Sequence, residues 1–257
     1  MTGESELEGR VAVVTGALGR LGPVWTGVLA RAGATVVGLD LRGGEHAGTQ
    51  LLQADVTDRG ALQDTLERIR SEHGRSPDVL VNNAGIDQPP DAAAQTHAIE
   101  DVPLDAFRGT LDVNLVGTFN ATQVFGAAMR DAGGGSIVNV GSLYASIAPD
   151  PAFYDHLDVD PPFLKPAAYG ASKAGVLSLT RYFARLWGPN GVRVNALSPG
   201  GFRGEQDAQF LEKYCARVPL GRMAEASDLE GPLLFLASDA SRYVTGHELR
   251  VDGGFTA

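Results

Sequence analysis

Short runs of valine and other apolar residues alternate along this chain with stretches of helical periodicity, and this alternation constrains the fold most. The apolar runs lie at 10–15, 34–39, 51–56, 78–82, 136–141, 192–197 and 247–252. The main helical stretches lie at 58–73, 104–130, 167–187 and 226–238. Runs that are apolar on both faces are typical of parallel strands covered by helices. We therefore predict a doubly wound α/β fold with right-handed crossovers.

Length and charge narrow the class of protein further. The 257 residues contain no repeat or linker, so we expect a single domain over 1–257. A net charge of −10 gives no electrostatic footprint for nucleic acid or for an anionic membrane. The single cysteine, Cys215, fits a reducing compartment. With no targeting or spanning segment recognisable, we expect a cytoplasmic protein with no nucleic-acid or membrane partner.

Three glycines mark the turn that follows the first predicted strand. Gly16, Gly19 and Gly22 lie in the segment Thr15-Gly-Ala-Leu-Gly-Arg-Leu-Gly, just before a helix. Such a turn lets backbone N–H groups approach a pyrophosphate, and the helix N-terminus adds partial positive charge. An ordinary strand–helix turn is the alternative. We predict that Gly16, Gly19, Arg20 and Leu21 contact a dinucleotide.

An acidic residue at the end of the next strand favours the dinucleotide interpretation. Asp40 follows Gly22 by 18 residues and is placed to bind both ribose hydroxyls of an adenosine. Because the same carboxylate would repel a 2′-phosphate, we expect NAD rather than NADP. Arg20 and Arg42 weaken this expectation, since a guanidinium accepts a 2′-phosphate; they are equally well explained as surface charges.

A second acidic residue has two possible roles. Asp55 and Val56 follow another short strand, and we include both among the predicted cofactor-binding residues. The Asp55 carboxylate can bond an adenine amino group, or it can cap the helix that starts near Asp58. The sequence leaves these alternatives open.

A tyrosine and a lysine are spaced for acid–base chemistry. Tyr169 and Lys173 are four residues apart in a helical stretch and therefore share one face. A phenol has a pKa of about 10, and a neighbouring ammonium lowers it. Ser142 offers a hydroxyl that can hold a reacting oxygen. The alternative for a tyrosine and lysine at this spacing is a solvated helix face.

Taken in order, the motifs resemble those of the short-chain dehydrogenase/reductase family over nearly the whole chain. They are the glycine turn, Asn82-Asn83-Ala84-Gly85, Asn114, Ser142, Tyr169-Gly-Ala-Ser-Lys173, Ser198-Pro199-Gly200-Gly201 and Val251-Asp252-Gly253-Gly254. The resemblance implies a Rossmann-type domain with a seven-stranded parallel sheet. It also implies an NAD(P)-dependent oxidoreductase that moves hydride between the nicotinamide and a secondary alcohol or ketone.

The resemblance also assigns roles to residues. It implies Tyr169 as general acid/base, Lys173 as the group that lowers its pKa and binds the nicotinamide ribose, and Ser142 as the residue that orients substrate. It implies that Asn114 positions a water for proton relay. Further cofactor contacts are implied at Asn83, Ala84, Gly85, Pro199 and Gly200, whereas Asn82 is expected to tie its strand to the neighbouring strands. The family commonly forms homodimers and homotetramers, and no metal is implied.

Two departures from the family pattern concern the glycines and the catalytic spacing. The TGxxGxxG spacing places Arg20 where the shorter members carry glycine, and it is commoner in a branch containing sugar-nucleotide epimerases and dehydratases. Ser142 and Tyr169 are separated by more residues than is usual, and the additional ones fall in the Pro- and Asp-rich segment 147–166. Since catalytic residues anchor both ends of that segment, we expect a substrate lid there; a surface excursion is the alternative.

The same region suggests a class of substrate. The acids of 147–166 (Asp150, Asp155, Asp158, Asp160) would favour a polyhydroxylated or cationic substrate, unless they face water. Tyr144 and Phe202 are our candidate substrate contacts; residues 201–204 lack the threonine that the family often has a few residues after the Pro-Gly turn. We expect a small polar alcohol or ketone, such as a sugar, sugar acid or cyclitol.

Two other function classes remain open from the sequence. One is a sugar-nucleotide epimerase or dehydratase whose NAD stays bound and is regenerated. The other is a dinucleotide-sensing module without catalysis, against which the intact Ser142, Tyr169 and Lys173 argue.

Overall fold

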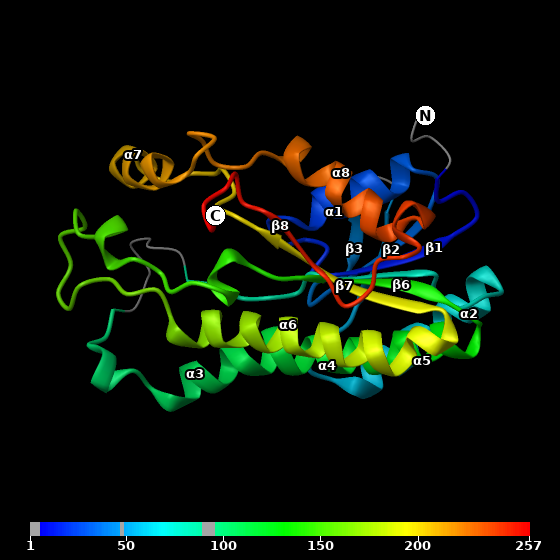
Figure 1. The fold of residues 1–257 in the computed structure, drawn as a ribbon. Helices are drawn as coiled ribbons and strands as arrows, with labels where there is room; N and C mark the ends of the chain where they lie inside the picture. The colour runs from blue at the N-terminus through cyan, green and yellow to red at the C-terminus, as the bar shows by residue number, and fades with distance from the viewer. Residues whose placement is uncertain (1–5, 47–48, 89–95) are drawn as a thin grey trace.

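A computed structural model describes residues 6–46, 49–88 and 96–257, and its centre is one twisted sheet (Figure 1). The strands are β1 Val11–Thr15, β2 Thr35–Asp40, β3 Gly44–His46, β4 Thr49–Gln53, β5 Val79–Asn82, β6 Gly135–Val140, β7 Val192–Pro199 and β8 Glu248–Val251. Their order across the sheet is β3-β4-β2-β1-β5-β6-β7-β8. The central strand β1 is buried along its whole length, as its unbroken apolar run predicts.

Seven of the strands are parallel, which confirms the fold class predicted from the sequence. The eighth, β3, pairs antiparallel with β4 at the edge of the sheet and was not predicted. Its three residues form no apolar run, so periodicity gives no signal for it. The strand order reverses its direction between β1 and β5, which is where open α/β sheets form their ligand crevice.

Helices cover both faces of the sheet. They are α1 Gly22–Arg31, α2 Arg59–His73, α3 Leu104–Leu111, α4 Gly117–Ala121, α5 Ala127–Asp131, α6 Ala167–Trp187, α7 Ala208–Arg217 and α8 Ala226–Ala237. Short 3-10 turns lie at Ile99–Asp101, Leu143–Ala145, Pro151–Phe153, Gly188–Asn190 and Asp239–Ser241. α1 and α8 lie together on one face, and α2, α4, α5 and α6 lie on the other (Figure 1). In the described part, none of the helices combines the length and apolarity that a membrane crossing requires.

The start of α2 settles one question that the sequence left open. The carboxylate that caps this helix belongs to Asp58, which accepts hydrogen bonds from the backbone N–H groups of Gly60 and Ala61. Asp55 instead accepts from the backbone and hydroxyl of Thr57, at 2.8 Å each. The capping alternative for Asp55 is therefore wrong, because the helix begins too late for its side chain to serve.

The predicted long helix 104–130 is a continuous helical run that contains two π-helical stretches. Between α3 and α4 residues Asp112–Val116 are π-helical, and between α4 and α5 so are Thr122–Gly126. Small residues pack this run against α6: a Cβ on its Gly126 would lie 2.3 Å from the Trp187 ring, and one on Gly175 of α6 would lie 2.8 Å from Leu115. Gly126 and Gly175 therefore serve close packing inside the chain, not the outer face of the helices.

The segment 147–166 packs against α7, a helix that was not predicted. Phe153, Tyr154 and Phe163 are buried together with Phe210 and Tyr214 of α7. Stacked and edge-to-face ring contacts connect these side chains, among them Tyr154 with Phe210 at 5.5 Å between ring centroids. Together they form a satellite core, and α7 lies beyond the carboxyl ends of the strands (Figure 1).

Candidate active site

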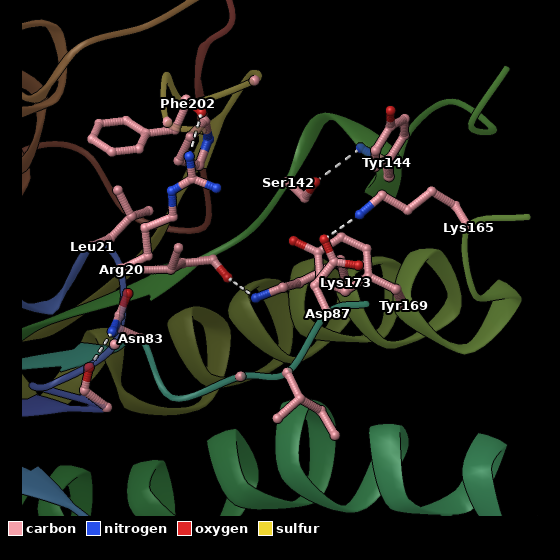
Figure 2. Close-up of a pocket in the computed structure, with 18 of the residues that line it drawn as sticks. Arg20, Leu21, Asn83, Asp87, Ser142, Tyr144, Lys165, Tyr169, Lys173 and Phe202 are labelled. Carbon is pink, nitrogen blue, oxygen red and sulfur yellow. Dashed lines mark hydrogen bonds and ion pairs between the residues drawn. The ribbon is translucent and has the colours of Figure 1, made fainter. Parts of the chain in front are cut away.

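A cavity of about 1260 Å³ opens at the carboxyl ends of the parallel strands. Nearly all the residues singled out from the sequence line it, namely Gly16, Gly19, Arg20, Leu21, Asp40, Asp55, Val56, Asn83, Ala84, Gly85, Ser142, Tyr144, Tyr169, Lys173, Pro199, Gly200 and Phe202. Asn114 is not among the lining residues. Figure 2 shows how side chains from distant parts of the chain converge there.

The glycine turn and the end of β5 interlock at the floor of the cavity. Gly16 has φ +64°, and a Cβ there would lie 2.7 Å from Ala84 Cα. The Asn83 side chain donates to the Gly16 carbonyl at 2.8 Å and accepts from the Trp25 indole N–H at 2.8 Å. The Asn83 amide thus holds the turn in place. Only bare backbone is left facing the cavity at Gly16, as a pyrophosphate cradle requires.

Asp40 lies where β2 ends, with only 14% of its side chain exposed. One carboxylate oxygen accepts from the Leu18 backbone N–H at 3.0 Å, which fixes the acid against the glycine turn. The Arg42 guanidinium lies 3.8 Å from the other oxygen. The end of the cavity predicted to take adenosine therefore presents one held carboxylate and one cation.

Arg20 lies apart from this pair. Its guanidinium donates to the Phe202 carbonyl at 3.3 Å and covers the Phe202 ring, 5.6 Å from the centroid (Figure 2). A Cβ on Gly204 would lie 1.5 Å from the same guanidinium. Two departures from the family pattern, Arg20 and Phe202, are therefore in contact with each other. Arg20 connects the glycine turn to the loop after β7.

Ser142, Tyr169 and Lys173 meet where β6 ends and α6 begins. Ser142 accepts from the backbone N–H of Tyr144 at 3.2 Å, which orients its hydroxyl. That hydroxyl is hydrogen-bonded to the Tyr169 phenol. Lys173, one turn further along α6, donates to the Val140 carbonyl at 2.8 Å and lies 5.8 Å from the centre of the Tyr169 ring. The predicted shared helix face is thus the wall of the cavity, not a solvated surface.

Burial sets the protonation of this group. It raises the pKa of Tyr169 to about 12, and the nearby Asp87 carboxylate acts in the same direction, while the Ser142 hydrogen bond lowers it. Burial also lowers the pKa of Lys173 to about 8. Desolvation of both groups dominates here and keeps the phenol protonated; that Lys173 lowers the pKa of Tyr169 stays a prediction.

Asn114 lies in the first π-helical stretch and is fully buried. Its carboxamide accepts from the Ile86 backbone N–H at 2.7 Å and donates to the Ile86 carbonyl and the Ser172 hydroxyl. The side chain therefore holds the chain after β5 against α6. The predicted proton relay through a water at Asn114 stays a prediction. Asn82 ties its strand to its surroundings as expected, through Thr122 and Asn139.

The acids of 147–166 do not form the polar wall that we expected. Asp150 is paired with Arg217 and Asp155 with Lys213, both on α7, and Asp158 and Asp160 are exposed. The segment instead contributes Tyr154, His156, Leu157 and Lys165 to the cavity. Of the two alternatives that the sequence left open, the structure favours carboxylates turned away from the cavity: α7 supplies cations for Asp150 and Asp155, and Asp158 and Asp160 are exposed.

Several lining residues had no signal in the sequence. Asp87 follows β5, Lys165 precedes α6, and the two form an ion pair in the cavity wall. His156 Nε2 lies 2.9 Å from the carboxylate of Asp207, the residue that caps α7. Each pairing joins residues far apart in the chain, so only the tertiary structure shows it.

The residues present fit a nicotinamide dinucleotide. The held Asp40, the bare backbone at Gly16 and the buried Lys173 all line the cavity, and they match the adenosine ribose, the pyrophosphate and the nicotinamide ribose in turn. In the described ranges no three His, Cys, Asp or Glu side chains gather as metal ligands would. Backbone at Gly16 and the side chains of Asp40 and Lys173 suit a phosphate-bearing organic cofactor.

Comparison with known proteins agrees with this geometry. The family described as short chain dehydrogenase matches residues 10–154, and the one described as enoyl-(acyl carrier protein) reductase matches 159–256. D-threitol dehydrogenase from Mycolicibacterium smegmatis is 34% identical over 273 residues, covering 97% of this chain and 94% of that protein.

Solved structures are similar over their whole length. A short chain dehydrogenase from Leptospira borgpetersenii with bound NAD⁺ has a TM-score of 0.86 and 32% identity, covering 98% of this chain and 94% of that one. A gluconate 5-dehydrogenase from Burkholderia cenocepacia in complex with NADP and tartrate has a TM-score of 0.85 and 30% identity, covering 100% and 99%. The chain belongs to the short-chain dehydrogenase/reductase family, the NAD(P)-dependent oxidoreductases that act on CH–OH groups.

Proposed function

We propose that this protein oxidises a secondary hydroxyl of a sugar alcohol or related polyol with NAD, and catalyses the reverse reduction. The observation that carries the proposal is the meeting of Ser142, Tyr169 and Lys173 beneath a cavity wall with polar side chains. Tyr144, His156 and Lys165 supply hydrogen-bonding groups there. The named activity of the threitol-oxidising relative, and the tartrate in the gluconate 5-dehydrogenase structure, support a polar substrate.

The side chains divide the reaction between them. Oxidation removes a hydride from the carbinol carbon and a proton from its hydroxyl, leaving a ketone. When bound, the nicotinamide supplies the acceptor for the hydride. The Ser142 hydroxyl and the Tyr169 phenol hold the reacting oxygen, and Tyr169 takes its proton. Lys173 places a positive charge beside the phenolate so formed, and the Val140 carbonyl fixes its position.

Protonation favours one direction at neutral pH. With a pKa of about 12, the Tyr169 phenol carries its proton and is ready to donate it to a ketone oxygen. Oxidation needs the phenolate, so its rate should rise with pH. Ketone reduction should decline as pH rises through about 8, where Lys173 loses its charge.

The preference for NAD is part of the same proposal. Asp40 is held against the glycine turn, where it would meet the ribose hydroxyls and repel a 2′-phosphate. Arg42 is the cation next to Asp40, whereas Arg20 contacts Phe202. We therefore assign Arg20 to the reactive end of the dinucleotide. Arg42 is then the cation that would bind a 2′-phosphate and so oppose the effect of Asp40.

A substrate panel tests the proposal. Purified protein with NAD⁺ is given threitol, galactitol and gluconate, and absorbance at 340 nm is followed. We expect NADH to accumulate with at least one polyol. Turnover confined to acyl thioesters would contradict the proposal in favour of the reductase activity named for the second matched family. Copurifying NAD with no net absorbance change would favour an epimerase or dehydratase.

Residues 147–166 act as the substrate cover in this proposal. Tyr154, His156 and Leu157 face the cavity while Phe153 anchors the segment in the satellite core. We also propose a homodimer or homotetramer. Tyr182 and Leu186 on α6 are 61% and 50% exposed, which gives that helix an apolar outer face. Light scattering that shows a stable monomer would contradict the oligomer.

A further inference from the structure

An ion pair in the wall of the cavity is left unused by the reaction described above. Lys165 ends the 147–166 segment and Asp87 follows β5, 78 residues away. The Lys165 ammonium bonds the Asp87 carboxylate and also the Gln88 carbonyl at 3.3 Å. Only 10% of the Lys165 side chain is exposed, against 38% of the Asp87 side chain. Both residues line the cavity.

The pair lies beside the reacting group. Lys165 Nζ is 5.8 Å from the centre of the Tyr169 ring, the same distance as Lys173 Nζ. Figure 2 shows Asp87 and Lys165 next to Tyr169, with Ser142 and Tyr144 across the space between them. A substrate whose reacting oxygen touches Ser142 and Tyr169 therefore brings its neighbouring atoms up to the pair.

Stability alone does not account for two charges in this position. A salt bridge with little exposure gains about as much from attraction as it loses in desolvation, so an apolar pair would be no worse. Counted over the described residues, the pair also retains hydrogen-bonding capacity. Two of the three ammonium donors are used by Asp87 and Gln88. The carboxylate oxygens accept from Lys165 and from the Gln88 backbone, and each retains a second lone pair.

Adjacent donor and acceptor groups match a hydroxyl, which both donates and accepts. Because the two charges cancel, a neutral hydroxyl fits better than a carboxylate or an ammonium. An alkyl group in the same place would displace water from the pair and form no hydrogen bonds in its place. Charged groups left without hydrogen-bond partners in this way carry a large free-energy cost.

We propose that Asp87 and Lys165 bind the hydroxyl on the carbon adjacent to the reacting carbon, so that the substrate is a vicinal diol. This inference rests on the proposed function and names its substrate class. Asp87 and Lys165 are specificity residues in this account, and Tyr169, Ser142 and Lys173 carry out the chemistry on any secondary alcohol.

The test uses alcohols that lose hydroxyl groups stepwise: threitol, butane-2,3-diol and butan-2-ol. For the natural protein with NAD⁺, kcat/KM should be about 10- to 100-fold higher for butane-2,3-diol than for butan-2-ol, the range of hydrogen bonds to charged groups. The double variant Lys165→Met with Asp87→Asn leaves no buried charge unpaired. With both alcohols measured at one pH, its kcat/KM for butane-2,3-diol should equal that for butan-2-ol, and NADH binding by fluorescence should be unchanged.

Lys213→Met is the matched control. Like Lys165, Lys213 forms an ion pair with an aspartate, in this case Asp155 of the 147–166 segment. Unlike Lys165, Lys213 does not line the cavity. This variant should keep the diol preference. Equal kcat/KM for diol and mono-alcohol in the natural protein would overturn this inference and leave the proposed function standing. The same holds if kcat/KM of the double variant falls by the same factor for all three alcohols. Absence of NADH with every alcohol overturns the proposed function together with it.

Discussion

The two ends of the cavity are built by different means. The end predicted to take the dinucleotide is made by strand termini and backbone, with Gly16 open to the cavity and Asp40 fixed by Leu18. The substrate end is made by side chains from the 147–166 segment and α7, which meet in a satellite aromatic core. Backbone requirements are written locally in the sequence. Side-chain pairings between distant segments cannot be recognised locally. The dinucleotide end can therefore be shared by a whole family, whereas the substrate end differs from one member to the next.

Tyr169 joins the two ends, so its removal has the largest expected effect. Tyr169→Phe keeps the ring but removes the proton carrier, and kcat for polyol oxidation should fall by about 10²- to 10⁴-fold. NADH binding, followed by fluorescence titration, should be unchanged because the phenol oxygen is all that is lost. A variant that keeps its kcat would contradict the role of Tyr169 as proton carrier.

Destabilising the satellite core should affect polyol binding without affecting NADH binding. Phe153 is 3% exposed and contacts Phe210, Tyr214 and Phe255. Phe153→Ala should destabilise this core by about 3–5 kcal/mol. We expect KM for the polyol to rise while the Kd for NADH stays within a factor of about two, the stability loss being read from denaturant unfolding.

Phe153→Leu is the control for that change, because it retains most of the apolar volume and should have a much smaller effect. Loss of NADH binding in proportion to polyol binding would contradict the separation, since it would show that the satellite core also supports the dinucleotide end.

Charge at the dinucleotide end should decide cofactor choice. Asp40→Asn keeps an acceptor for Leu18 but removes the negative charge, so NADPH binding should improve relative to NADH by about 10- to 100-fold. Arg42→Gln should weaken NADPH alone. Arg20→Gln should weaken both cofactors equally, because Arg20 contacts Phe202. Fluorescence titrations with both cofactors distinguish these outcomes, and a selective loss of NADPH in Arg20→Gln would contradict our assignment.

A substrate-end charge should also shift the pH dependence. The Asp87 carboxylate raises the pKa of Tyr169 and of Lys173. Asp87→Asn removes this influence, so both groups lose their protons at lower pH. The rising limb of the oxidation rate against pH should therefore move toward acid. A profile that is unchanged, or that moves toward alkali, would show that Asp87 does not act on the phenol.

The smallest effect is expected at the outer face of the 147–166 segment. Asp155 pairs with Lys213 where 64% of its side chain is exposed. Asp155→Asn should change the free energy of unfolding by less than about 1 kcal/mol and leave KM unaltered. Thermal unfolding at low and high salt measures this, and a rise in KM would indicate that the ion pairs, not the aromatic rings, hold the cover in place.

Sequence periodicity and motif order predicted the parallel sheet and the dinucleotide end, because both depend on local pattern. The edge strand β3 and the π-helical stretch around Asn114 carry no such pattern. α7 did carry one: Phe210 and Tyr214 are four residues apart and Asp207 is a capping residue just before them. That signal could have been found from the sequence.

The substrate end could not be predicted because its charges pair across the fold. Asp150 and Asp155 read as substrate contacts until α7 is seen to supply their partners. Asp87 and Lys165 gave no signal singly, since an acid after a strand and a lysine before a helix are ordinary surface residues. Likewise, the protonation of Tyr169 depends on burial, which spacing along a helix does not report.

The most direct test of the account follows the hydride itself. Threitol carrying deuterium on its secondary carbons is oxidised with NAD⁺, and the nucleotide formed is analysed by mass spectrometry. The account predicts that the deuterium appears in the reduced nucleotide and that the sugar product is a ketose. A reduced nucleotide that carries no deuterium would contradict direct transfer from the carbinol carbon to the dinucleotide, and with it the dehydrogenase assignment of this site.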